Sequence, residues 1–243
     1  MILSMKILTL NCWGTNGPAE RLPVLEAALR GTLVDLLLLQ ETPPGLPEKL
    51  SGNTRLTAPD AGLSIISRFP AESYEILTYA AQSPTEKIAR ELLLVRLKTD
   101  GGPFWAATTH LSWRPEEEPI RLAQMEELVS RAERLSGPVL VGGDFNAAPD
   151  QHSIRRLAAA GWRDLFAERE PNEAGITWDN RNPFIQGHSV RFPDRRIDLL
   201  FLRRRGSEAL RVAAAEVVFD QAGPEGLHPS DHYGVTARLS AAR

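Results

Sequence analysis

The sequence predicts a mixed α+β fold, because segments with the pattern of strands outnumber helical segments roughly two to one. The strands do not alternate strictly with helices, so a doubly wound parallel sheet fits the order poorly. The 243 residues also contain no internal repeat, no low-complexity tract and no break in composition that would mark a linker. We therefore expect one domain over residues 1–243, large enough to bury a substantial core.

The expected elements of the first half follow from apolar runs and the residues that end them. Strands are expected at 6–11, 34–41, 62–67, 74–79, 90–97 and 104–110, and a helix at 18–30. Pro43-Pro44-Gly45 prevents the second strand from continuing. Asp100-Gly101-Gly102-Pro103 indicates a hairpin between the last two strands, with a loop longer than two residues.

The second half begins with a helix at 119–135, where apolar residues are interleaved with charge and Gly137-Pro138 follows. A buried strand is expected from residue 139. Further strands are expected at 196–202, 210–219 and 233–239, and a short helix at 153–160. Residues 168–195 are polar and carry Trp178. A connection of this length is usually functional or mobile.

Charge and composition exclude several classes of protein. The chain has 28 basic and 31 acidic residues, a balance that argues against broad electrostatic wrapping of DNA. Its one cysteine, Cys12, cannot form an intrachain disulfide. We find no pattern of a secretory signal and no apolar run long enough to span a bilayer. The expectation is a cytoplasmic monomer.

One stretch, residues 139–146, has the features of a site rather than of a core. An apolar run ends in Gly142 and Gly143 and is followed at once by Asp144 and Asn146. Glycine lets the backbone turn sharply at the end of a strand. Side chains two residues apart on a strand project to the same face. The strand therefore presents an acid and an amide together at one edge.

Other polar residues recur at the ends of predicted strands. The set is Asn11, Glu41, His110, Asp144, Asn146, Asp198, Asp231 and His232. Carboxylate and amide oxygens suit a hard cation such as Mg²⁺ or Mn²⁺. Zinc fits less well, because the chain has no cysteine cluster and no pair of histidines at helical spacing. A hard cation beside a His–Asp pair is suited to phosphate-ester hydrolysis.

Six short motifs that contain these residues resemble the endonuclease/exonuclease/phosphatase (DNase I-like) superfamily. They are Thr9-Leu10-Asn11, Leu39-Gln40-Glu41, Thr109-His110-Leu111, Gly143-Asp144-Phe145-Asn146, Arg196-Ile197-Asp198 and Ser230-Asp231-His232. Each motif alone is weakly specific, but six in the order of that family are highly specific. The resemblance implies a four-layer αββα sandwich, with two packed mixed β-sheets flanked by helices. It also implies Mg²⁺- or Mn²⁺-dependent hydrolysis of a phosphodiester by in-line attack of water.

The resemblance assigns the metal ligands and part of the catalytic set. Glu41 would be the principal ligand of the metal, supported by Asn11 and Asp231. His232 would sit against the scissile phosphate or act as a base, and Asp198 would orient it. Each assignment has a plainer alternative: Asn11 would cap a turn, and Asp198 would pair with a neighbouring arginine at the surface.

The remaining assignments concern the water and the phosphate. Asp144 and Asn146 would orient both of them. His110 would stabilise or protonate the far side of the phosphate, and Arg90 resembles the family's phosphate-binding position. The deoxyribonuclease branch pairs the equivalent of His110 with a glutamate, and we find none near Gly62. The alternatives are a structural role for His110 and an ordinary strand-edge position for Arg90.

Other residues receive no catalytic role. His152, His188 and His228 are expected at the surface or in loops, and Cys12 is expected to be a small buried residue. Arg203-Arg204-Arg205 is expected to be a solvated run of charge.

The sequence predicts the type of reaction more specifically than it predicts the substrate. Trp13, Trp113 and Trp178 fall in predicted loops, where they would either pack in the core or stack on a base, a phenolic ring or a lipid. Thr177-Trp178-Asp179 and the Ser230-Asp231-His232 region resemble the branch of sphingomyelinase-like proteins and tyrosyl-DNA phosphodiesterases.

Three functions remain open at this stage. The first is a phosphodiesterase of broad or small-substrate preference. The second is a nuclease or DNA-end processing enzyme, similar to tyrosyl-DNA phosphodiesterases or abasic-site endonucleases. The third is an inactive member of the fold that binds a partner. The complete set of polar strand-end residues argues against the third function, because a scaffold has no physical reason to keep them together.

Overall fold

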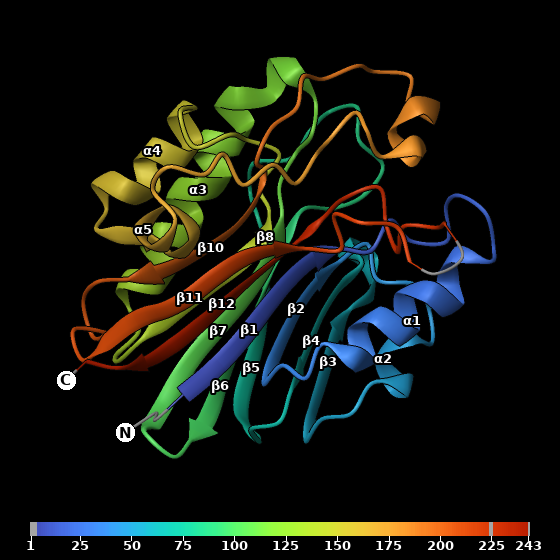
Figure 1. Ribbon diagram of the computed structural model, residues 1–243. Coiled ribbons are helices and arrows are strands. Elements are labelled where there is room, and N and C mark those ends of the chain that lie inside the picture. The colour runs from blue at the N-terminus through green and yellow to red at the C-terminus, as the bar shows by residue number, and fades with distance from the viewer. Residues whose placement is uncertain (1–3, 224–225, 243) are drawn as a thin grey trace.

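The computed structural model describes residues 4–223 and 226–242. Two six-stranded sheets pack face to face, with helices α1 and α2 outside one sheet and α3 and α4 outside the other (Figure 1). This arrangement confirms the predicted four-layer αββα sandwich. No helix within the described residues is long and apolar enough to cross a membrane.

The first sheet contains both ends of the described chain. Its strands lie in the order β11-β12-β1-β2-β4-β3. Their bounds are Ser4–Asn11 (β1), Leu36–Gln40 (β2), Thr54–Ala58 (β3), Leu63–Ser67 (β4), Leu210–Val218 (β11) and Gly234–Ala241 (β12). The helices beside this sheet are α1, Arg21–Gly31, and α2, Leu46–Lys49.

The second sheet is formed by the middle of the chain, in the order β5-β6-β7-β8-β10-β9. Its strands are Ala71–Thr78 (β5), Glu91–Thr99 (β6), Gly102–His110 (β7), Val139–Asp144 (β8), Trp162–Asp164 (β9) and Asp198–Arg203 (β10). The helices of this half are Glu118–Glu133 (α3), His152–Ala159 (α4) and Leu165–Arg169 (α5). Three 3₁₀ turns span Pro59–Ala61, Pro115–Glu117 and Pro183–Gly187.

The two sheets have the same pattern of strand directions, although the sequence has no visible repeat. Each has one parallel pair at its centre, β1 with β2 and β7 with β8, and its other neighbours are antiparallel. A parallel pair needs a crossover connection. Here α1 joins β1 to β2 and α3 joins β7 to β8. The carboxyl ends of both parallel pairs therefore become available at one end of the sandwich.

Burial on both faces explains the continuous apolar runs of the central strands. In β2, Leu36 and Leu38 pack between the two sheets, whereas Leu37 and Leu39 pack against the α1 side. Side chains of successive strand residues point to opposite faces, so a strand between two apolar layers needs apolar residues at every position. A third apolar cluster lies between the second sheet and α3, where it includes Met125 and Leu128.

Several local predictions differ from the structure. The hairpin between β6 and β7 has a two-residue connection, Asp100 and Gly101, because Thr99 already pairs with Gly102. Strands β3 and β9 and helices α2 and α5 were not expected. Strand β3 has only its end residues buried, so it lacks a clear apolar alternation. The two helices are short, at 4 and 5 residues.

The prediction of a solvated charge run is wrong for Arg203. Its side chain is buried and donates to the carbonyls of Ala132, Leu135 (2.9 Å) and Gly137 (2.8 Å). These carbonyls lie at the end of α3 and just after it, where backbone acceptors lack partners within the helix. Arg204 is exposed as expected.

We expect Arg203→Met to lower the free energy of unfolding by about 2–4 kcal/mol, because three carbonyl groups lose a charged donor. Urea denaturation followed by circular dichroism measures the effect. The exposed neighbour provides the control, and Arg204→Met should change stability by less than about 0.5 kcal/mol. Equal effects of the two substitutions would show that the contacts of Arg203 contribute nothing particular.

Candidate active site

The candidate site lies where the carboxyl ends of the two parallel pairs meet. Asn11 ends β1 and Glu41 directly follows β2, whereas His110 ends β7 and Asp144 ends β8. A cavity of about 320 Å³ opens at this edge of the sandwich. Its lining includes Asn11, Glu41, Arg90, His110, Asp144, Asn146, Asp231 and His232. The structure thus brings together every residue that the sequence proposed for the site, with Asp198 directly behind His232.

Asn11 connects the acids of the two sheets. Its Nδ2 donates to Glu41 Oε1 at 3.1 Å and to Asp144 Oδ2 at 3.0 Å. Its Oδ1 accepts from the backbone N–H of Trp13 at 2.9 Å. In this orientation the amide fixes the positions of both carboxylates, and its own oxygen is engaged by the backbone.

Strained backbone is concentrated around the cavity. Trp13, Glu41 and Asn146 have φ angles of 59°, 45° and 49°, in the left-handed region that side chains other than glycine rarely adopt. All three residues line the cavity. Such conformations persist where the surrounding structure imposes them, and they cluster at functional sites. For Asn146, the Asp144 carboxylate accepts its N–H at 2.9 Å, and its own Nδ2 donates to Leu111 O at 2.9 Å.

The glycine before Asp144 is required by a close approach of two strands. A Cβ on Gly143 would lie 2.1 Å from the carbonyl oxygen of Thr109 on β7. Only glycine permits this contact. The close pairing of β7 and β8 places His110 opposite Asp144, with His110 Nε2 at 3.4 Å from Asp144 Oδ2.

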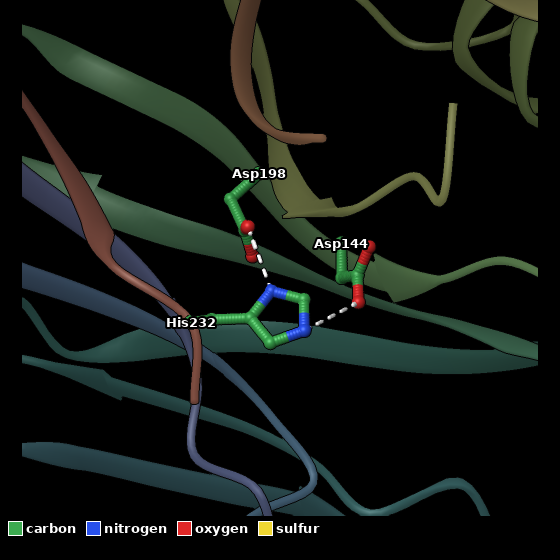
Figure 2. Close-up of side chains that lie close together, drawn as sticks. All are labelled: Asp144, Asp198 and His232. Carbon is green, nitrogen blue, oxygen red and sulfur yellow. Dashed lines mark hydrogen bonds and ion pairs between the residues drawn. The ribbon is translucent and has the colours of Figure 1, made fainter. Parts of the chain in front are cut away.

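Asp198 and His232 form a buried pair across the site. His232 Nδ1 lies 2.9 Å from Asp198 Oδ2, and His232 Nε2 lies 3.8 Å from Asp144 Oδ2 (Figure 2). Thr177 holds the backbone of Asp198, because its hydroxyl accepts the N–H groups of Ile197 at 3.1 Å and Asp198 at 3.2 Å. The imidazole ring is therefore held between two carboxylates.

The turn that carries Asp231 and His232 is held from two directions. The buried side chain of Asn182 donates to the carbonyls of Ser230 at 2.9 Å and Asp231 at 3.2 Å. The hydroxyl of Ser230 donates to Asn11 O at 2.7 Å, which ties the turn to the end of β1. These contacts set the direction in which both functional side chains leave the backbone.

Electrostatics divides the two histidines into different protonation states. Burial alone would lower the pKa of His232, but the charges of Asp198 and Asp144 outweigh it and raise the pKa to about 10. Burial and the positive charges of Arg90 and His232 hold the pKa of His110 well below its usual range. At neutral pH, His232 is therefore a cation and His110 a neutral imidazole.

The pKa values of two acids in the site, Asp144 and Glu41, are also raised. Burial raises the pKa of Asp144 to about 6, against the opposing charge of His232. Burial raises the pKa of Glu41 as well, and the negative charge of Asp231 raises it further. Within residues 4–223 and 226–242, neither Glu41 nor Asp231 forms an ion pair with a lysine or arginine.

This charge distribution fits a divalent cation between Glu41 and Asp231. A carboxylate whose ionised form is disfavoured by burial and by a neighbouring acid, as Glu41 is, is stabilised by a hard cation, and the oxygen donors of both residues suit Mg²⁺ or Mn²⁺. The donor set thus agrees with the metal that the resemblance implies, and we propose that Glu41 and Asp231 would hold it. Asn11, which was expected as a supporting ligand, supports the site by orienting Glu41, because its Oδ1 already accepts the N–H of Trp13.

A second group of ligand atoms also lies close together but fits a metal less well. Asp144, Asp198 and His232 have ligand atoms within 4.8 Å of one another. However, His232 Nδ1 is engaged by Asp198, and its raised pKa keeps the ring protonated. A protonated imidazole has no lone pair for a metal. We interpret these three residues as a proton-handling group.

Arg90 lies in the wall of the cavity next to the second sheet. Its Nε donates to Glu86 Oε2 at 2.6 Å, and the other carboxylate oxygen of Glu86 accepts the N–H of Trp113 at 2.8 Å. A guanidinium that is fixed by a carboxylate on one side is well oriented to contact an anion on the other.

Aromatic side chains surround the mouth of the cavity. Trp13, Trp113 and Trp178 all line it, together with Phe192 from the long polar segment that the sequence left without structure. Trp178 and Arg195 form an isolated β-bridge that joins the two ends of residues 178–195, a loop that we call the flap. His188, Phe192 and Arg195 of the flap also line the cavity. Trp178 is buried and lies edge-on to His232, with ring centroids 5.0 Å apart.

Sequence reasoning missed the role of His188, which it placed among surface and loop histidines. His188 Nε2 lies 2.9 Å from Asp231 Oδ2, and its ring lies 5.0 Å from that of Trp178 and 6.0 Å from that of Trp13. Its loop has no regular pattern, and the two partners are 43 residues apart. No local signal in the sequence could have revealed the contact.

Comparisons with known proteins agree with this geometry. A model of the Endonuclease/Exonuclease/phosphatase family matches residues 8–232. Nocturnin of Xenopus laevis is 29% identical over 150 residues, which are 55% of this chain and 36% of that protein. The matched region thus spans about a third of the length of that relative.

Solved structures with low sequence identity share the fold. The TDP2 structure from D. rerio, complexed with a single strand DNA product, has a TM-score of 0.81 and 21% identity, with 97% of this chain and 98% of that chain covered. An endonuclease/exonuclease/phosphatase family protein from Bacteroides thetaiotaomicron has a TM-score of 0.78 and 17% identity, with 98% and 95% covered.

We expect His188→Ala to weaken Mn²⁺ binding about tenfold, because the partner that orients Asp231 is lost. His188→Gln should recover part of the affinity, since an amide N–H can replace the donor. Mn²⁺ titration followed by electron paramagnetic resonance measures the dissociation constant without substrate. The matched control is His152→Ala, since His152 is exposed on α4. Unchanged affinity in His188→Ala would refute the role of His188.

Proposed function

This chain belongs to the endonuclease/exonuclease/phosphatase family, and we propose that it is a Mg²⁺- or Mn²⁺-dependent phosphodiesterase. Membership in the family supports a phosphoester hydrolase in general. The finer proposal is in-line attack by a water molecule on a phosphodiester.

One observation carries the proposal: two groups with different chemistry face the same cavity. Glu41 and Asp231 supply oxygen donors that have no lysine or arginine partner among the described residues, whereas Asp144 and the Asp198–His232 pair supply groups that accept and donate protons. Phosphoester hydrolysis requires both, because negative charge must be stabilised while water is deprotonated. A purely structural cluster of acids would not need oxygen donors for a cation on one side and a proton-handling group on the other.

The residues divide the work of the reaction as follows. Asp144 accepts the proton of the attacking water, and a pKa of about 6 suits a base near neutral pH. His232, held as a cation by Asp198, donates to a phosphate oxygen and stabilises its charge. Glu41 and Asp231 would hold the cation, which would supply Lewis-acid stabilisation of the phosphate. Asn11 holds Glu41 and Asp144 at fixed positions.

The other polar residues bind the phosphate. His110 is neutral and donates a single hydrogen bond, which favours stabilisation of the phosphate over its protonation. Arg90 and Asn146 complete the set around the phosphate oxygens. We propose that these residues act within a single domain, and that the protein is a monomer of the cytoplasm.

A nuclease or DNA-end processing activity is the second candidate. It is favoured by the aromatic mouth of the cavity, where Trp13 and Trp113 can stack on a nucleobase. The fold-level similarity to a TDP2 structure that holds a DNA product is consistent with it. An inactive binding protein is the weakest candidate, since the proton-handling group and the oxygen donors are both complete.

We expect Asp144→Asn to lower kcat by about 10²- to 10⁴-fold with little change in KM, because the base that activates water is lost. Hydrolysis of bis(p-nitrophenyl) phosphate with Mg²⁺, Mn²⁺ or EDTA measures both constants. Asp150→Asn is the matched control, since Asp150 is exposed just beyond the same strand. A mutant that changes only KM would contradict the role.

Plasmid DNA, abasic DNA, a 5′-tyrosyl DNA end and sphingomyelin should be assayed in parallel to distinguish the two candidates. A preference for a DNA substrate over the small diester would favour the second candidate. Turnover that survives EDTA would contradict metal dependence.

A further inference from the structure

Arg195 is a cation in the wall of the cavity that the proposed reaction does not use. It lies beside β10 in the flap, and its position is fixed by the backbone. Its N–H donates to Trp178 O at 3.0 Å, and its carbonyl accepts the N–H of Trp178 at 2.9 Å. The side chain lines the same cavity as Asp144 and His232.

The guanidinium of Arg195 has no polar partner within the described residues. It lies 3.8 Å from the ring centroid of Phe192 and 6.0 Å from that of Trp178. Its Nε is buried without a hydrogen bond, and its terminal nitrogens form no ion pair with any residue in 4–223 or 226–242. Arg90 differs in this respect, because its Nε donates to Glu86 Oε2 at 2.6 Å. Partial burial of a cation without a hydrogen-bonded anion is unfavourable.

The two arginines act on different parts of the site. The charge of Arg90 influences the pKa values of Glu41 and His110. Burial lowers the pKa of Arg195, and the charges of Asp144 and Asp198 oppose that effect. Arg195 therefore interacts with the charges of the proton-handling group, whereas Arg90 interacts with those of Glu41 and His110, and both arginines line the same cavity.

We propose that Arg195, with the aromatic rings of Phe192 and Trp178, forms a subsite for a second phosphate group of the substrate. This inference rests on the proposed phosphodiesterase function and specifies its substrate class. A guanidinium fork matches the geometry of phosphate oxygens. Phe192 and Trp178 hold the guanidinium in the cavity wall. Trp13 and Trp113, which are partly exposed and line the same cavity, offer flat surfaces to a planar group such as a nucleobase. The preferred substrate is thus a nucleotide diester that carries a further phosphate.

A matched pair of chromogenic substrates tests the subsite. Thymidine 5′-(p-nitrophenyl phosphate) has only the scissile diester, and its 3′-phosphorylated form adds one phosphate to the same molecule. Water attacks phosphorus and p-nitrophenolate leaves in both cases. The wild-type enzyme should prefer the 3′-phosphorylated form by about tenfold in kcat/KM, the effect expected of a charge-assisted hydrogen bond.

Variants of Arg195 test whether its charge causes the preference for the 3′-phosphorylated substrate. Arg195→Met keeps an apolar contact with Phe192 but should bring the preference to about one, and Arg195→Lys should retain part of it. Arg204→Met removes an exposed arginine and should leave the tenfold preference unchanged. If Arg195→Met lowers both activities equally, the side chain serves the scissile phosphate or the fold, and the subsite is refuted. A wild-type enzyme without preference also refutes it.

A binding measurement distinguishes failure of the proposed subsite from failure of the proposed phosphodiesterase function, because it does not depend on hydrolysis. Calorimetry with Mg²⁺ present compares thymidine 3′,5′-bisphosphate with thymidine 5′-phosphate. Tighter binding of the bisphosphate that disappears in Arg195→Met supports the subsite, even if neither chromogenic ester is hydrolysed. Equal binding of the two nucleotides refutes the subsite, even if both esters are hydrolysed.

Discussion

The site depends on one amide that joins the two sheets. Asn11 ends the first strand, and its Nδ2 donates both to Glu41 of the first sheet and to Asp144 of the second. These contacts connect residues 30 and 133 positions apart. They hold two acids close together in a region where burial disfavours their charge. The separation between the metal-binding and proton-handling parts of the site is therefore set by the packing of one sheet against the other.

Buried arginines stabilise the loops around this amide. Arg21 donates to the carbonyls of Cys12 at 2.9 Å and Pro229 at 2.7 Å, which links the loop after β1 to the turn before Asp231. Arg121 donates to the carbonyls of Ser112 at 2.9 Å and Arg114 at 2.8 Å, after β7. Loops without regular structure leave carbonyl groups that need donors. One guanidinium satisfies several of them and fixes the loops that carry the site.

The sequence was sufficient to predict site residues whose signal lies in neighbouring residues of the chain. Apolar runs that end in Asn11, Glu41, His110 and Asp144 mark strand ends, and their common edge follows from the fold that the motifs imply. The sequence was insufficient where a side chain acts at long range. Arg203 looks like part of a charged run, yet its partners at the end of α3 lie about 70 positions earlier in the chain. His188 and Asn182 likewise act on the Asp231 turn through contacts that depend on how the flap folds back. The short loop between β6 and β7 was missed because Gly102 and Pro103 continue the strand.

The central claim is that Glu41 and Asp231 hold the cation, while Asp144, Asp198 and His232 handle protons. Anomalous scattering from a crystal soaked in Mn²⁺ tests this claim most directly, because it locates the ion without reference to activity. The account predicts a peak in contact with the carboxylates of Glu41 and Asp231. A peak bound by Asp144, Asp198 and His232 instead, with none at Glu41, would contradict it.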